Sequence, residues 1–346
     1  MNQSNKLAII LGLMLTLSCA EEETSPTQIP GLFENGVFIS NEGNFGDADG
    51  SISFIHENGT VQNNLFKSVN NIVLGDVVQS LHRTGDHLFA VVNNSNKVEV
   101  MTLDSLKSSY TMTDVALPRY MDSDENTGYL TEWVSFTDSG RVTLFDLSTG
   151  TISSSIKTGF GTEGVLLIED MLFVTNSFSS ELVIIDLSTE QIVKSLEVGN
   201  SPKLMVTDKD GHLWIGCAGG YDSDFQPLGD GALVEIDVEN LSILSTVNIG
   251  SNFSGKIASN LIGEEIYFTV GNEVKALDMV TNQIKTKVTQ SDVTSFYGIG
   301  VDEDGNLYAS DAQGFEGNGK VYVYSTDGML KYSAAVGRGP NGFAFN

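Results

Sequence analysis

The sequence has little of several residue types on which protein folds and active sites commonly depend. Of its 346 residues only two are cysteine, and Cys19 stands at the end of an N-terminal leader. Cys217 therefore remains alone in the folded part, which excludes an internal disulfide and leaves packing as the source of stability. Proline occurs only six times, whereas glycine occurs 36 times, and Ser, Thr and Asn fill short polar segments. This composition is typical of an all-β chain with many tight turns.

Positive charge is also scarce. The chain has 18 Lys and Arg against 45 Asp and Glu, a formal net charge of −27. A nucleic-acid partner needs a basic surface, so we expect none. The same charge disfavours electrostatic docking on anionic lipid and favours solubility in a crowded cell-surface layer.

Patterns of known catalytic chemistry are missing as well. The four histidines lie in or beside predicted turns, and none has metal-ligand spacing to another: His56, His82, His87 and His212. The chain has no G-x-S-x-G elbow and no phosphate-binding glycine loop. The segments DKDGH at Asp208 and DEDGN at Asp302 begin like calcium loops but lack the later ligands, so we interpret them as hairpin turns. We predict a protein that is not an enzyme and needs no cofactor.

The N-terminus carries a targeting signal. An apolar run of eleven residues, 7–17, follows Lys6, which suits a signal peptide and is short for a membrane helix. Ser18-Cys19 resembles a bacterial lipobox, although Thr16 stands where Leu is common. We predict a signal peptide over 1–18 and lipidation of Cys19, with secretory cleavage near a free cysteine as the alternative. The segment 19–33 is then an acidic tether, and its three glutamates at 21–23 resemble a surface-export signal of lipoproteins. These targeting signals predict that the protein lies on the outer membrane and faces the cell exterior.

An internal repeat organises the rest of the chain. The repeated motif is an apolar pair followed by Asp, an apolar residue and a turn. It recurs at Asp146, Asp186, Asp237 and Asp278, with spacings of 40, 51 and 41 residues. Each repeat carries four strand signals, and a period in the forties indicates the blades of a β-propeller.

The two ends of the repeat region complement each other. The first unit, over about 36–72, has three predicted strands, whereas units starting near 75, 115, 160, 200, 251 and 291 each open with an additional one. The final segment 338–346 is such an opening strand with nothing after it. We therefore predict an all-β, seven-bladed β-propeller over 34–346, closed by pairing of the C-terminal strand with the first blade.

Aromatic and cationic residues gather in the loops that would form one face of this propeller. Aromatic rings with a few polar groups suit a sizeable organic ligand. The longest loop, 217–231, accounts for the 51-residue spacing, and long loops on rigid scaffolds often bind ligands. The predicted ligand-binding residues are Phe45, Arg119, Tyr120, Trp133, Phe178, Lys203, Tyr221, Phe225, Gln226, Phe253, Tyr297, Phe315 and Arg338. The alternative for any one of these rings is packing between blades, which we expect for Trp214.

Two other functions stay open at this point. Glu163 lies at a blade entrance, with Glu42 and Glu132 near other loops, and three carboxylates around a channel could hold a divalent metal as in propeller lactonases. No spacing requires such a site. The ring could also act as an adhesion module that binds only protein partners.

The repeat SPKLMVTDKDGHLWIGC, over 201–217, resembles the YncE-like seven-bladed propellers. The opening VFISNEGNFGDADGSISFI, over 37–55, is similar to cell-surface lipoproteins of that class from Gram-negative bacteria. The resemblance implies a binding protein on the outer membrane. Some members capture cobalamin or other corrinoids, and similar lipoproteins capture iron chelates, for a TonB-dependent transporter. We therefore expect capture of such a bulky nutrient, although no corrinoid-contact motif maps onto this chain.

Overall fold

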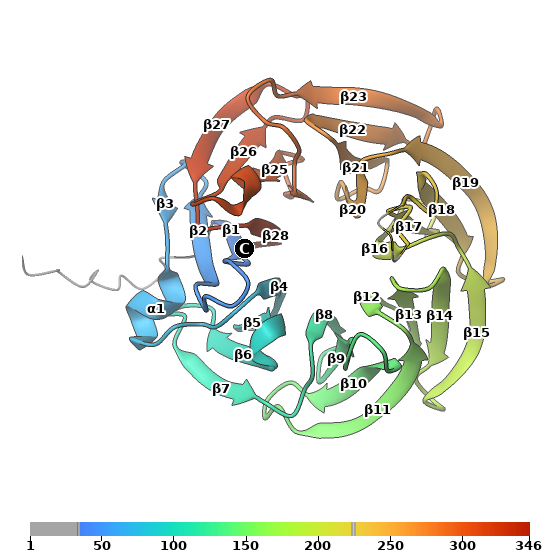
Figure 1. The fold of residues 1–346 in the computed structure, drawn as a ribbon, viewed down its shortest axis with the longest axis horizontal. Coiled ribbons are helices and arrows are strands. Elements are labelled where there is room, and N and C mark those ends of the chain that lie inside the picture. The colour runs from blue at the N-terminus through green and yellow to red at the C-terminus, as the bar shows by residue number, and fades with distance from the viewer. Residues whose placement is uncertain (1–32, 34, 223, 225) are drawn as a thin grey trace, which may run out of the picture.

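The computed structural model describes residues 33, 35–222, 224 and 226–346. Seven four-stranded sheets surround a central channel, which makes the chain a seven-bladed β-propeller, as the repeats predicted (Figure 1). No helix within the described residues has the length and apolar character needed to cross a bilayer. The predicted signal peptide, the lipidation site Cys19 and all but the end of the tether lie outside the described residues.

Each blade follows an antiparallel meander from an innermost to an outermost strand. Blade 1 contains β28 (Pro340–Phe345), β1 (Gly36–Asn41), β2 (Ser51–His56) and β3 (Val61–Gln62). Blades 2 and 3 contain β4 (Val78–Thr84), β5 (His87–Val92), β6 (Lys97–Thr102), β7 (Ser108–Met112), β8 (Pro118–Ser123), β9 (Thr127–Glu132), β10 (Gly140–Asp146) and β11 (Ile152–Gly159). Blade 4 contains β12 (Thr162–Ile168), β13 (Met171–Asn176), β14 (Glu181–Asp186) and β15 (Gln191–Glu197).

The remaining three blades repeat this order. Blade 5 contains β16 (Pro202–Thr207), β17 (Leu213–Cys217), β18 (Gly231–Asp237) and β19 (Ser242–Gly250). Blades 6 and 7 contain β20 (Phe253–Ser259), β21 (Glu265–Val270), β22 (Glu273–Asp278), β23 (Gln283–Thr289), β24 (Gly298–Val301), β25 (Leu307–Asp311), β26 (Lys320–Tyr324) and β27 (Leu330–Ala335). Helix α1 (Leu65–Asn70) and the 3-10 turns η1 (Asn93–Ser95) and η2 (Gln313–Phe315) lie in the connections.

The ring closes as the complementary ends predicted. Strand β28 pairs antiparallel with β1, from Val37 opposite Phe345 to Asn41 opposite Pro340. The C-terminal strand thus becomes the innermost strand of blade 1, next to the first strand of the folded part. This pairing covers the edge of β1 that an open ring would leave unpaired.

The recurring aspartates end the third strand of their blades. The Oδ1 atom of Asp186 accepts the backbone N–H groups of Ser188 and Thr189, at 2.8 and 3.3 Å. The same arrangement follows β10, β18 and β22. Aspartate side chains form such turns locally, so the repeat marks the hairpin between the third and fourth strands.

Two details differ from the sequence prediction, and both concern blade 1. Phe33, the last residue of the predicted tether, is only 5% exposed and lies 5.1 Å from the ring of Phe54 and 5.5 Å from that of Phe38. Its ring covers the inner part of the blade, so this residue belongs to the folded domain. The sequence reasoning ended the tether by its polar composition and missed this contact.

The second difference is α1. The third predicted strand of the first unit covered residues 60–66, and the helix replaces the end of it. Only Val61 and Gln62 are extended, and the chain then turns into the helix. Leu65 and Phe66 are both buried in one cluster with Leu74. Consecutive side chains of a strand point to opposite faces, whereas a helical turn allows both to reach the same core.

Side-chain hydroxyl groups fix blade 3 against blade 4 and blade 4 against blade 5 beside the channel. Thr175 on β13 donates to the carbonyl of Lys203 on β16 at 2.7 Å, and Thr131 on β9 donates to that of Glu163 on β12 at 2.5 Å. At Gly164 a Cβ atom would lie 2.4 Å from the carbonyl oxygen of Lys203, so only glycine permits this approach. The innermost strands are therefore held in register by their neighbours.

Candidate ligand-binding site

A ring of polar side chains lines one end of the channel, at the start of the innermost strands. In six blades the residue is the second of its strand, and in blade 7 it directly precedes the strand. The ring residues are Gln79, Arg119, Glu163, Lys203, Ser254, Tyr297 and Asn341. In β4, β8, β12, β16 and β20 the pairing register shifts at this point. Such bulges re-aim side chains, and here they accompany side chains that line the channel.

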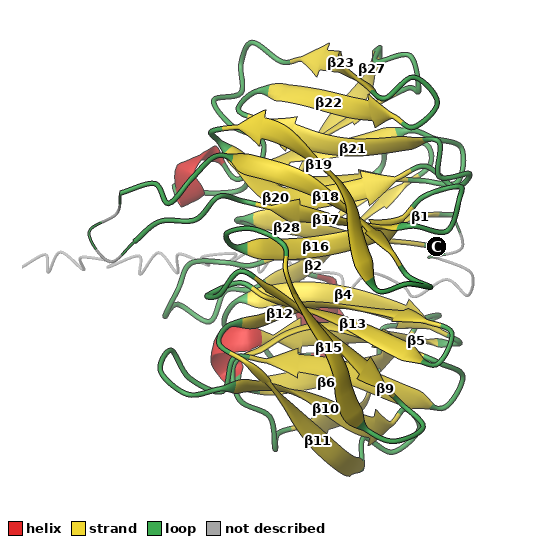
Figure 2. Ribbon diagram, turned by 90° about the vertical axis from the view of Figure 1, so that its right-hand side faces the viewer, coloured by secondary structure: helices red, strands yellow, loops and turns green. Residues whose placement is uncertain are grey.

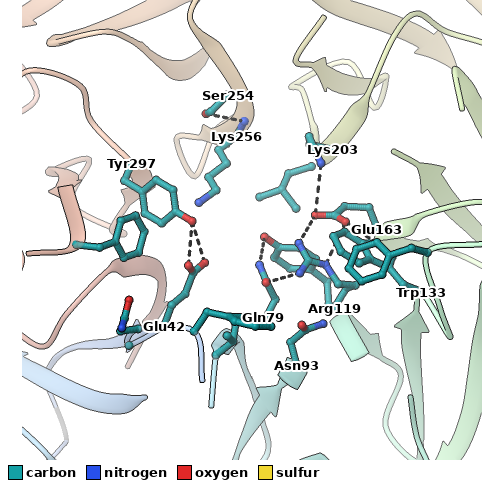
Figure 3. Close-up of a pocket in the computed structure, with 18 residues that line it drawn as sticks. Glu42, Gln79, Asn93, Arg119, Trp133, Glu163, Lys203, Ser254, Lys256 and Tyr297 are labelled. Carbon is teal, nitrogen blue, oxygen red and sulfur yellow. Dashed lines mark hydrogen bonds and ion pairs between the residues drawn. The ribbon is translucent and has the colours of Figure 1, made fainter. Parts of the chain in front are cut away.

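Six of these residues, all but Asn341, enclose with the adjoining loops a cavity of about 560 Å³, which we call the cup (Figure 3). Its wall combines aromatic rings with five charged residues. Two are acidic, Glu42 and Glu163, and three are basic, Arg119, Lys203 and Lys256. In a chain of net charge −27, the cup thus has a local excess of one positive charge.

One side of the cup, the Glu163 side, is a closed ionic network. Arg119 Nη2 lies 2.8 Å from Glu163 Oε1, and Arg119 Nε lies 3.1 Å from Oε2. Trp133 Nε1 donates to the same Oε2 at 2.9 Å, and Lys203 Nζ lies 3.9 Å from Oε1. The Arg119 guanidinium also lies 3.9 Å from the Trp133 ring centre and donates to Gln79 Oε1 at 2.5 Å.

This network keeps Glu163 ionised. Burial alone would raise the pKa of its carboxyl, but the charges of Arg119 and Lys203 and the hydrogen bonds from Arg119 and Trp133 lower it to about 2. Burial likewise opposes the charge of Arg119, and Glu163 outweighs that effect and raises the pKa of the guanidinium. Both groups are therefore charged, buried and mutually satisfied.

The opposite side, the Lys256 side, is looser. The Tyr297 hydroxyl lies 2.9 and 3.1 Å from the two oxygens of Glu42. Lys256 Nζ lies 3.9 Å from the Tyr297 ring centre and donates to Asn341 Oδ1. No carboxylate of the described residues stands within ion-pair distance of Lys256.

Without a direct ion pair, burial dominates the titration of this side. It lowers the pKa of Lys256 to about 8, although the charge of Glu42 acts in the opposite sense. It also raises the pKa of Glu42 above its ordinary value of 4.5, and it raises that of Tyr297. The Lys256 ammonium is thus a cation that lacks a close counter-charge and can lose its proton near physiological pH.

A second cavity, which we call the groove, adjoins the cup. Its volume is about 1180 Å³, and it shares Trp133, Phe136, Lys203 and Ser254 with the cup wall. Trp133 and Phe178 lie 4.7 Å apart, and Phe178 and Phe136 stack at 6.3 Å with an interplanar angle of 19°. Tyr221, from the loop between β17 and β18, contributes to the far wall. That loop extends on the left of the molecule in Figure 2.

The structure brings most of the predicted residues to these two cavities. Seven line the cup: Phe45, Arg119, Tyr120, Trp133, Lys203, Tyr297 and Phe315. Three others, Phe178, Tyr221 and Phe253, line the groove. Phe253 is 3% exposed and packs on Phe268 at 5.6 Å, so most of its ring belongs to the core between blades, as does Trp214.

The remaining predicted residues lie elsewhere. Arg338 pairs with Asp47 and Asp49 at 3.7 and 3.4 Å and lines neither cavity. Gln226 is exposed and lies outside both walls. Phe225, like Cys19, falls outside the described residues.

Sequence reasoning did not select Gln79, Phe136, Lys256 or Asn341 as ligand contacts. A signal for part of the ring was present, because a polar residue follows proline at the start of three innermost strands, at Arg119, Lys203 and Asn341. Proline suits the first residue of a strand, and the next residue is then turned by the bulge. Lys256 was recognised as a cation of the loop face but not as a ligand contact, and it lies two residues beyond the ring position of its own strand.

The three carboxylates considered for a metal do not form a ligand set. Glu132 does not line the cup, and its carboxylate takes Arg141, at 2.9 Å from both oxygens, together with Thr143. Glu163 is already bound by two cations and an indole N–H, an environment that opposes a metal ion. Among the described residues, the cluster with metal-ligand proximity is formed by Asp208 and His212, at the turn between β16 and β17, and by Glu235 on β18. Its oxygens already accept from Trp214 and Ser245, at 2.8 and 2.6 Å.

Comparison with known proteins gives the fold and the family. Among solved structures, a periplasmic gluconolactonase of Pseudomonas aeruginosa matches with 13% identity over 90% of this chain and 98% of that one, with a TM-score of 0.67. A functionally unknown protein of Desulfotomaculum acetoxidans matches with 12% identity over the same shares and a TM-score of 0.69. A quinonprotein alcohol dehydrogenase-like protein of Bacteroides thetaiotaomicron matches with 13% identity over 90% and 78%, and a TM-score of 0.66.

At these identities the likeness concerns the fold alone. No curated protein matches the chain. One family model does, over residues 35–338, which is nearly the whole propeller. The chain therefore belongs to the family described as Domain of unknown function (DUF5074).

Proposed function

We propose that this protein is a non-enzymatic binding protein that captures a bulky organic nutrient at the cup face. The ligand classes are a corrinoid such as cobalamin and an iron chelate, and the recipient is a TonB-dependent outer-membrane transporter. The observation that carries the proposal is the concentration of aromatic rings and polar groups around one cavity, at Tyr120, Trp133, Tyr297 and Phe315. Aromatic faces with few convergent polar groups suit a large, flat ligand.

The N-terminal address supports the transport part of the proposal. A lipid on Cys19 would place the propeller on the outer membrane, facing the exterior, and the acidic segment that follows would act as a tether. The family resemblance adds the corrinoid and iron-chelate classes and the transporter.

Isothermal titration of the purified full-length chain with cyanocobalamin and with a ferric catecholate siderophore tests the ligand class. We expect heat of binding with one of them, and at least tenfold weaker binding in Phe136→Ala, because that ring is 71% exposed at the cup rim and its loss removes stacking area without disturbing the core. Leu261→Ala is the matched control, since Leu261 is 76% exposed in the turn between β20 and β21 and lines neither cavity. Absence of heat with both ligands would contradict the proposal.

A further inference from the structure

The cup and the groove have contrasting chemistry although they share a wall. The cup carries five charged side chains, whereas the larger groove has two, Lys203 and Asp222, among large apolar, seryl and asparaginyl side chains. Phe136, Phe178, Tyr221 and Leu228 are all well exposed there. An exposed apolar cluster of this kind beside a polar cavity is typical of a binding surface.

The shared residues make the two cavities continuous. Trp133 and Phe136 belong to both walls, and so do Lys203 and Ser254. The volumes of about 560 and 1180 Å³ each reach the size of a drug-sized ligand site. A single ligand can therefore place one end in the cup and the other on the stacked rings.

Lys256 determines which chemical group the ligand needs at the end that lies in the cup. Its Nζ atom is held by Asn341 and by the Tyr297 ring, but it has no carboxylate partner at ion-pair distance in the described part of the chain. Arg119, the other strong cation of the cup, is saturated by Glu163 and Gln79. A partly buried cation without a direct counter-charge favours an anionic ligand group, because that group restores the charge balance that burial disturbs.

We infer that the ligand is an amphipathic organic anion whose acidic group meets Lys256 in the cup and whose flat apolar body lies along Phe136 and Phe178 in the groove. This inference rests on the proposed function and narrows it, since it favours an acidic ligand over a neutral one. It adds the groove as a second compartment of the same site.

The charge on Lys256 makes the binding of such an anion dependent on pH. Burial lowers the pKa of Lys256 to about 8, so the side chain is mostly protonated at pH 7 and loses its positive charge above about pH 8. The affinity for an anion falls over the same range. The charged and titratable groups that face Lys256 from the neighbouring blades are Glu42, Arg119, Glu163, Lys203 and Tyr297.

The test compares two probes that share a pyrene ring and a short alkyl chain but end in a charged carboxylate or a neutral hydroxyl, 1-pyrenebutyrate and 1-pyrenebutanol, by fluorescence titration of the full-length chain. At pH 7 we expect the carboxylate to bind about tenfold more tightly. Lys256→Met removes this preference by bringing the affinity for the carboxylate down to that for the alcohol, and Phe178→Ala weakens both probes. Lys285→Met, which removes a lysine of the outer strand β23, is the matched control and changes neither.

The pH arm uses Lys256→Arg, because a guanidinium stays protonated. In the natural chain the preference for the carboxylate falls between pH 7 and pH 9, whereas in Lys256→Arg it persists. Equal affinities for the two probes in the natural chain would overturn the anionic part of the inference. If Lys256→Met and Lys285→Met lowered the preference for the carboxylate equally, that preference would come from long-range attraction and not from contact with Lys256. This result would also overturn the anionic part of the inference. Failure of both probes to bind would reject the combined site, while the cobalamin and siderophore titrations would still decide the capture proposal.

Discussion

The two sides of the cup use the same kinds of residue in opposite ways. The Glu163 side sets a cation, a carboxylate and an aromatic ring in direct contact, with Arg119 and Glu163 2.8 Å apart. The Lys256 side has the same three kinds, and Tyr297, like Trp133, bonds the carboxylate and packs against the cation. Here, however, the cation Lys256 makes no ion pair with the carboxylate of Glu42. The difference teaches that a charged cluster in a channel can be structural on one wall and available to a ligand on the other.

Burial explains why the two sides are unequal in energy. Removing one partner from a buried, hydrogen-bonded ion pair leaves an uncompensated charge, which costs about 3–5 kcal/mol. Removing a buried charge that has no direct partner relieves a desolvation cost instead. The comparison therefore predicts effects of opposite sign for substitutions on the two sides.

The largest effect is expected from Glu163→Gln. This change leaves Arg119 buried beside a neutral amide, and we expect the free energy of unfolding to fall by about 3 kcal/mol. Urea denaturation followed by tryptophan fluorescence measures it. Asp210→Asn is the control, because Asp210 pairs with Lys209 on the surface and should leave the midpoint unchanged. An unchanged midpoint in Glu163→Gln would show that the ion pair with Arg119 does not stabilise the fold.

Acid titration should sharpen the same contrast. The pKa of Glu163 is lowered to about 2 in the folded state from an ordinary value of 4.5. The stabilisation it provides is thus complete above pH 4.5 and is lost as the pH falls towards 2. We expect the difference in stability between the natural chain and Glu163→Gln, about 3 kcal/mol at neutral pH, to shrink steadily over this interval. A difference that does not change with pH would contradict the ionic explanation.

Thr175→Val tests how the scaffold positions the Glu163 side. The substitution removes the 2.7 Å hydrogen bond to the Lys203 carbonyl and leaves that buried group without its donor from blade 4. We expect a loss of about 1–2 kcal/mol in the free energy of unfolding. Thr246→Val, at an exposed position of the outer strand β19, is the control. An unchanged stability in Thr175→Val would mean that the hydroxyl does not hold the blades together.

The smallest effect, and the one of opposite sign, is expected from Lys256→Met. Burial lowers the pKa of this lysine from 10.5 to about 8, so its charged form opposes folding at neutral pH. We expect the substitution to raise the free energy of unfolding by roughly 1 kcal/mol or less at pH 7. The gain should decline above about pH 8 and disappear above the ordinary lysine pKa of 10.5, where the natural side chain is neutral in both the folded and the unfolded state. A loss of stability at pH 7 would place Lys256 in a structural network like that of Glu163.

Much of the fold could be predicted because its signals are local. The aspartates at Asp146 and Asp186 form turns with the residues that directly follow them, so their spacing reveals the blade period. The missing strand at one end and the additional strand at the other predicted the closure through β28. Helix α1 was missed because Leu65 and Phe66 respond to the core they meet, a contact that their immediate neighbours do not encode.

The candidate site was predicted in its location but not in its connections. Loop aromatics such as Trp133 and Phe315 were expected at the mouth of the channel, and they line the cup. Phe253 looked the same in sequence, yet it is mainly a packing residue. The distinction depends on whether a loop ring faces the channel or the neighbouring blade, which no local pattern states.

The sequence by itself determined the strands, their turns and the number of blades, because side-chain alternation and turn chemistry act over a few residues. Only the tertiary structure decided which charges meet. Glu163 and Arg119 are 44 residues apart, Lys256 and Asn341 are 85 apart, and Tyr297 reaches Glu42 across 255 residues. Closing the ring brings these residues together, and burial then separates their roles, since a paired charge in the channel wall stabilises the fold and the unpaired one is the charge that we propose for the ligand.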